Sequence, residues 1–126
     1  MLAKKILVIT LWIALAVELL LTVGAFFLPE KTLALFKLSP SSDTFFLIHV
    51  IAWFLLIIDA LCFTAIRRIE RNDPLGWAIA NLLGSWWVLL GVSIYVLFGR
   101  PDNLFLDSLK GVVILVSGWV SRPRSA

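Results

Sequence analysis

Four long apolar runs separated by short polar segments constrain this chain more than any other feature. They cover residues 6–28, 44–66, 75–98 and 103–120. Each run is close to the roughly 20 residues that an α-helix needs to cross the hydrocarbon core of a bilayer, whereas β-strands usually contain about 3–10 residues. The runs also lack the alternation of apolar and polar residues that an outer-membrane barrel requires. Because backbone polar groups in hydrocarbon must be bonded within the protein, we expect four transmembrane helices.

The composition is that of a single all-α membrane domain. Hydrophobic residues make up 61% of the 126-residue chain, against roughly 45–50% in soluble domains. Four spans use most of the chain, so we expect one transmembrane four-helix bundle over residues 1–126 and no separate soluble domain. The net charge is only +3, and the basic residues cluster outside the apolar runs. This pattern predicts contact with membrane lipid and not with nucleic acid.

Polar segments with turn residues separate the runs. Pro29 ends the first run because proline cannot continue a helical hydrogen-bond ladder. The stretch Glu30–Leu38 is expected to form a short amphipathic helix with Leu33, Phe36 and Leu38 at the membrane interface. Residues 39–43, Ser-Pro-Ser-Ser-Asp, predict a turn and the N-cap of the second span. Residues 72–74 and 99–102 predict the two remaining turns.

The distribution of lysine and arginine predicts the orientation. One set of segments carries Lys4, Lys5, Arg67, Arg68, Arg71, Arg122 and Arg124, and the opposite set carries Lys31, Lys37 and Arg100, with Lys110 if it reaches that surface. Cytoplasmic segments carry the excess of positive charge, so we expect both termini in the cytoplasm. The first run is longer than the roughly 7–15 apolar residues of a cleaved signal peptide, so we expect it to be retained.

Polar groups inside the predicted spans are the candidate functional residues, because such groups are costly in hydrocarbon. The six candidates are Glu18, His49, Asp59, Asn81, Asp107 and Lys110. Asp107 and Lys110 are three residues apart, so they share a helix face and can pair. At about 1.5 Å rise per residue, His49 lies at a similar outer depth, with Glu18 beneath. Asp59 and Asn81 lie at comparable depths on the second and third spans, which predicts a hydrogen bond between them.

Two interpretations of these groups stay open. In the first, they form interhelical hydrogen bonds that hold the bundle together. In the second, they line a polar pocket or a proton path that opens to the outer side, with Glu18 as its central residue because it lies deepest. His49 is the only histidine and Cys62 the only cysteine, so we expect no metal site and no cofactor.

Small residues recur every fourth position on two spans. Gly76, Ala80 and Gly84, continued by Gly91, form such a stripe on the third span, and Thr10, Ala14, Glu18 and Thr22 form one on the first. These stripes allow helices to approach closely, so we expect both faces, Glu18 included, to point inward. Trp86 and Trp87 are unusual in mid-span, and we expect them to fill space toward the core or lipid more than to line a ligand cavity.

Four short motifs suggest a relationship. They are Phe27-Leu28-Pro29-Glu30 closing the first span, Leu35-Phe36-Lys37-Leu38-Ser39-Pro40 before the second, Arg71-Asn72-Asp73-Pro74 between the second and third, and Asp107 early in the fourth. In this layout the chain resembles the DoxX-like small four-helix membrane proteins of bacteria, several of which have no assigned activity. The resemblance implies a bacterial inner-membrane protein and assigns no site.

The sequence contains no nucleophile-elbow, phosphate-loop or zinc-protease motif. We therefore expect a non-enzymatic membrane protein that binds a hydrophobic ligand or a membrane partner. The alternative is a proton-coupled transporter of small molecules that works as a homo-oligomer, with Glu18 as the proton carrier and His49 and Asp107 toward the outer mouth. A lipid-modifying enzyme with His49 as its base is a third and weaker hypothesis.

Overall fold

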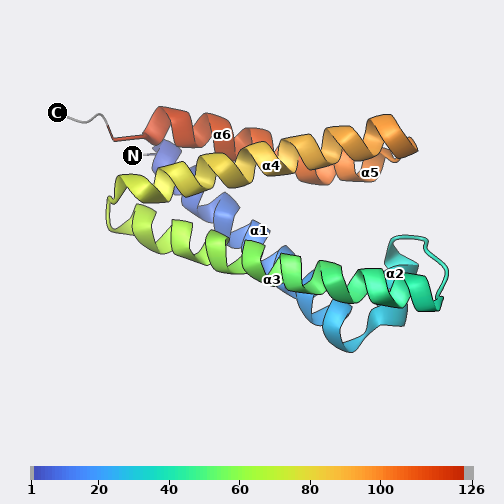
Figure 1. Ribbon diagram of the computed structural model, residues 1–126. Coiled ribbons are helices and arrows are strands. Elements are labelled where there is room, and N and C mark those ends of the chain that lie inside the picture. Colours follow the sequence, from blue (N-terminus) through green and yellow to red (C-terminus); the bar gives the residue numbers. More distant parts are fainter. Residues whose placement is uncertain (1, 124–126) are drawn as a thin grey trace. The chain divides into compact units, whose positions relative to one another are not determined.

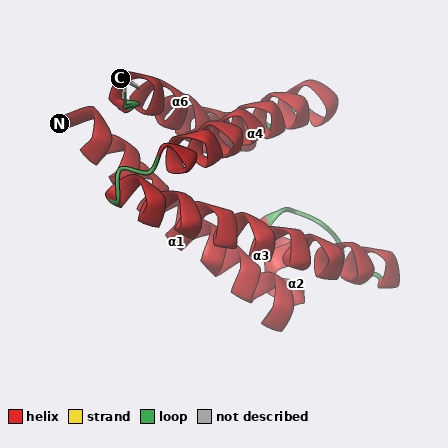
Figure 2. Ribbon diagram, turned by 60° about the vertical axis from the view of Figure 1, so that its left-hand side comes forward, coloured by secondary structure: helices red, strands yellow, loops and turns green. Residues whose placement is uncertain are grey.

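The computed structural model describes residues 2–123, and all secondary structure within this range is helical (Figure 1). In chain order the elements are α1 (Leu2–Phe27), α2 (Pro29–Leu35), α3 (Ser42–Glu70), α4 (Pro74–Phe98), α5 (Pro101–Asn103), η1 (Leu104–Ser108) and α6 (Leu109–Ser121). Short connections join these helices (Figure 2). The predicted all-α architecture is confirmed.

Four helical segments are long and apolar enough to cross a membrane: Leu2–Phe27, Ser42–Glu70, Pro74–Phe98 and Pro101–Ser121. They match the four predicted spans and extend beyond them mainly at Leu2 and Glu70, because the charged turns there continue the helix. Many large apolar side chains on these segments are exposed, such as Leu20 at 74% and Val96 at 72%. Exposed apolar surface of this extent belongs in lipid, so the chain is an integral membrane protein.

The chain divides into two compact units. Unit 1 contains residues 1–14 and 61–126, and unit 2 contains residues 15–60. Unit 1 therefore includes α4, η1 and α6, together with the first part of α1 and the last part of α3. Unit 2 contains the remainder of α1, all of α2 and the first part of α3.

The helix starts use the capping groups that the sequence provides. At the start of α3, Ser41 N donates to Thr44 Oγ1 at 2.7 Å and Thr44 N donates to Ser41 Oγ at 3.1 Å, which is the reciprocal arrangement of a capping box. At the start of α4, the Asp73 carboxylate accepts from Leu75 N at 3.0 Å and from Arg68. The hydrogen bond from the Leu75 amide, followed by that from Arg68, lowers the pKa of Asp73.

Unit 2 has a small apolar core that includes α2. Leu33 is 1% exposed and packs with Ala25, Ile48 and Ala52. The prediction that Leu33 lies at the membrane interface is therefore wrong. The predicted helix exists, but Leu33 faces α1 and α3 of the same unit, because the short connection Leu28 folds α2 back onto them.

Unit 1 depends on close approach between α4 and α6. A Cβ atom on Gly111 would lie 2.5 Å from the backbone oxygen of Gly84. A side chain at Gly111 would force the helices apart, so glycine is required there. At Gly84 a Cβ atom would lie 3.1 Å from the backbone oxygen of Gly111, a tight contact. Gly76, Ala80, Gly84 and Gly91 are all buried, and so are Ala14, Glu18 and Thr22 on α1. The predicted inward orientation of the two small-residue stripes is confirmed, with Thr10 half-buried.

Candidate functional site

Unit 2 contains a buried hydrogen-bonded group around Asp59. Thr22 Oγ1 lies 2.6 Å from Asp59 Oδ2 and 2.7 Å from the backbone oxygen of Glu18. Glu18, Thr22 and Asp59 are each 4% exposed. Asp59 Oδ1 is buried and has no hydrogen-bond partner among the described residues.

Thr22 is the partner of Asp59 that sequence reasoning missed. The structure places Thr22 beside Asp59. The predicted partner, Asn81, is exposed on α4 in unit 1, and its hydrogen bond with Asp59 stays a prediction. The sequence did indicate that Thr22 points inward, because it belongs to the predicted small-residue stripe of the first span, one turn beyond Glu18. Its hydroxyl is within donating distance of both the Asp59 carboxylate and the backbone oxygen of Glu18, and such shared hydrogen bonds are common in helices.

His49 lies in an aromatic group of unit 2. Trp53 Nε1 donates to His49 Nε2 at 3.3 Å, and the ring of Phe26 is 5.8 Å from His49 and 5.3 Å from Trp53, edge-on to both. A neutral imidazole that accepts at Nε2 carries its proton on Nδ1. Neither Phe26 nor Trp53 was among the predicted site residues, although Trp53 is four residues from His49 and therefore on the same helix face.

Unit 1 contains a second polar group, here called the Asp107 cluster: Trp87, Asn103, Asp107 and Lys110. Lys110 Nζ lies 3.5 Å from Asp107 Oδ1, which confirms the predicted pair. Asn103 Nδ2 donates to Asp107 Oδ2 at 2.9 Å. The Lys110 ammonium stands 4.2 Å from the centre of the Trp87 ring, where the ring attracts a cation.

The π-helical turn η1 presents the Asp107 cluster to α4. Ser108 Oγ donates to the backbone oxygen of Val88 at 3.1 Å, which fixes the turn against α4. A Cβ atom on Gly91 would lie 2.7 Å from the backbone oxygen of Asn103, so only glycine fits opposite this turn. Such π-turns are frequent at functional sites, and this one brings Asn103 and Lys110 to the two oxygens of the Asp107 carboxylate.

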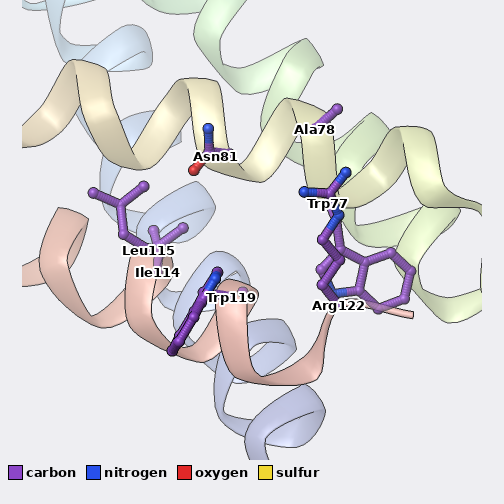
Figure 3. Close-up of a pocket in the computed structure, with 8 residues that line it drawn as sticks. Trp77, Ala78, Asn81, Ile114, Leu115, Trp119 and Arg122 are labelled. Atoms are coloured by element: carbon purple, nitrogen blue, oxygen red, sulfur yellow. The ribbon is translucent and has the colours of Figure 1, made fainter. Parts of the chain in front are cut away.

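A pocket opens between α4 and α6 in unit 1 (Figure 3). It has a volume of about 270 Å³. Its lining residues are Trp77, Ala78, Asn81, Ile114, Leu115, Gly118, Trp119 and Arg122. Asn81 is the one predicted candidate that lines it.

The lining changes character along the pocket. The helices run antiparallel, because Trp77 Nε1 donates to Ser121 Oγ at 3.0 Å while Gly84 lies against Gly111. Arg122, just beyond the end of α6, is therefore at the mouth of the pocket, and Ile114 lies about two turns deeper. The result is a cationic end that leads into an apolar wall, with the Asn81 amide between them. Small-molecule sites commonly combine apolar walls with a few polar groups in this way.

The predicted candidates thus divide among three places. Glu18 and Asp59 share the Thr22 group, Asp107 and Lys110 form a pair, and Asn81 lines the pocket. His49 lies apart from these three places, in the aromatic group with Trp53. Among residues 2–123, no group of three or more histidine, cysteine, aspartate or glutamate side chains is placed to hold a metal ion. Comparisons with protein families, curated proteins and solved structures found no match.

Proposed function

We propose that this chain is a non-enzymatic membrane protein that binds an amphiphilic, lipid-like ligand in the α4–α6 pocket. The observation that carries the proposal is the pocket itself, which combines a guanidinium, an amide and apolar side chains within one groove. A hydrophobic ligand alone would gain nothing from Arg122 or Asn81. An amphiphile uses both parts of the lining, because its polar end can be bonded while its tail replaces lipid against Leu115.

The orientation supports the same proposal. The excess of lysine and arginine at the N-terminus, the α3–α4 connection and the tail favours a cytoplasmic position for both termini. Arg124 of the tail lies outside the described residues. The pocket would then open at the cytoplasmic end of α4 and α6. The resemblance to DoxX-like proteins favours the inner membrane of a bacterium.

Filling the pocket tests the proposal. Ala78 is exposed and lines the pocket from α4, so Ala78→Leu adds bulk into the groove at a position where the helix tolerates it. We expect native mass spectrometry of the purified protein to show a retained amphiphile in the wild type and its loss in Ala78→Leu. Ala16→Leu, at an exposed position of α1 outside the pocket, is the matched control and should retain it. Retention by Ala78→Leu at the wild-type level would refute the proposal.

A second candidate function is proton-coupled transport by a homo-oligomer. The observation that favours it is the buried Glu18–Thr22–Asp59 group, which holds the Asp59 carboxyl group beside the Thr22 hydroxyl within a span. Carboxyl groups at membrane depth often belong to proton pathways. In proteoliposomes, a solute flux that follows an imposed pH gradient and is abolished by Asp59→Asn would support it. Flux that ignores the gradient would rule it out.

A further inference from the structure

We infer that the α4–α6 pocket selects an anionic phospholipid, with Arg122 holding the phosphate and Gly118 and Leu115 accommodating the start of an acyl chain. This inference rests on the proposed function and adds the chemical class of the ligand. Four features of the pocket support it. They are the availability of the Arg122 guanidinium, the depth of the Asn81 amide, the fixed apolar wall formed by Trp77, and the membrane depth marked by Trp119.

Arg122 supplies a cation that is available to a ligand. It follows Ser121, the last residue of α6, and its side chain is exposed while it lines the pocket. It forms no ion pair with any of residues 2–123. A guanidinium presents a planar set of donors that fits two phosphate oxygens at once, so a phosphodiester is the anion that this group binds best.

Asn81 lies deeper than Arg122 along the pocket. It is four residues from Trp77 on α4, which places it about one turn, or roughly 5.4 Å, farther from the mouth of the pocket at Arg122. In a glycerophospholipid the ester carbonyls follow the phosphate toward the tails. An amide N–H at this level can donate to such a carbonyl, so the order of polar groups in the pocket matches the order in the lipid.

The walls of the pocket suit an acyl chain. Trp77 is 4% exposed and its Nε1 is already committed to Ser121 Oγ at 3.0 Å, so its ring forms a fixed apolar wall. Gly118 has no side chain, and a Cβ atom there would come no closer than 3.9 Å to Leu7. Gly118 therefore lines the pocket with backbone alone, between Leu115 and Arg122 on the same helix end.

Trp119 marks the depth of the pocket in the membrane. Its side chain is 81% exposed beside the pocket, and tryptophan is enriched where headgroups meet hydrocarbon. Basic pockets between membrane helices on the cytoplasmic side bind anionic headgroups. The position of Trp119 and the proposed cytoplasmic orientation therefore agree with a phospholipid of the inner leaflet.

The test compares lipid retention by charge-matched variants. The full chain is purified from nanodiscs of equimolar phosphatidylglycerol and phosphatidylcholine, and retained lipids are counted by native mass spectrometry. We expect the wild type to retain phosphatidylglycerol preferentially and Arg122→Gln to reduce that preference about tenfold, the loss expected for one charge-assisted hydrogen-bonded contact. Arg122→Lys keeps the charge and should keep part of the preference.

Arg124→Gln is the control, because it removes the same charge from the same tail. It should change the preference by less than about threefold, since a charge that attracts anionic lipid only at long range is screened by salt. Equal losses in Arg122→Gln and Arg124→Gln would overturn the inference in favour of diffuse surface attraction. Displacement of the lipid signal by millimolar inorganic phosphate would also overturn it, because the site would then take free phosphate.

The two proposals fail in different ways. If the wild type retains both lipids equally and Ala78→Leu loses both, the pocket binds an amphiphile without selecting an anion, and only the inference is wrong. If Ala78→Leu retains lipid as the wild type does, the pocket is not the binding site and the proposed function fails as well.

Discussion

The substitution Gly111→Ala tests the packing that builds the pocket-bearing unit. Its Cβ atom would lie 2.5 Å from the backbone oxygen of Gly84 and 2.9 Å from the amide nitrogen of Val88. Ordinary contact begins at 3.4 Å, so α4 and α6 would have to separate by nearly an ångström. Because both neighbours are backbone atoms, no side-chain rotation can relieve the overlap.

The expected cost follows from two opposing effects. Overpacking of this kind destabilises by about 1–3 kcal/mol. Replacing glycine by alanine inside a helix stabilises by up to about 1 kcal/mol. We therefore expect a net loss of about 1–2 kcal/mol in the free energy of unfolding, measured by reversible denaturation in detergent micelles.

Gly118→Ala is the matched control on the same helix. Its Cβ atom would approach Leu7 at 3.9 Å, an ordinary contact, so only the helix-propensity effect remains and we expect stability to be unchanged or slightly raised. If Gly111→Ala proves as stable as Gly118→Ala, the close approach of α4 and α6 does not constrain this crossing and the reasoning is refuted.

Three further predictions concern polar groups. Thr22→Val should destabilise the protein by about 1 kcal/mol through loss of its hydrogen bonds, and a double-mutant cycle with Asp59→Asn should show coupling; additive effects would contradict the pairing. Lys110→Met should cost about 3–5 kcal/mol because it removes the ion-pair partner of the largely buried Asp107. Adding Asp107→Asn should recover much of the loss in the same unfolding assay. The pKa of Asp73 is lower in the folded state, so its N-cap of α4 stabilises the fold fully above the ordinary value near 3.8. This stabilisation is lost as pH falls through the folded pKa. The free energy of unfolding measured against pH should show this dependence in the wild type and lose it in Asp73→Asn.

Properties that depend on a bilayer and on the local chain could be predicted from sequence. A run of apolar residues has one backbone arrangement that satisfies its polar groups in hydrocarbon, so the four spans and their turns follow from residue type alone. The pairing of Asp107 with Lys110 also follows, because residues three apart on a helix are neighbours whatever surrounds them.

The tertiary structure decided the contacts between distant segments. The sequence predicted Leu33 at the membrane interface, yet it lies in the core of unit 2 because α2 folds back onto α1 and α3. Depth along a span does not say which side of α1 faces α3, and within unit 2 it is Thr22 that meets the Asp59 carboxylate. The pocket needs residues of α4 and α6 that are more than thirty positions apart. Helix period and depth fix which face a residue occupies, but only packing fixes which neighbouring helix that face meets.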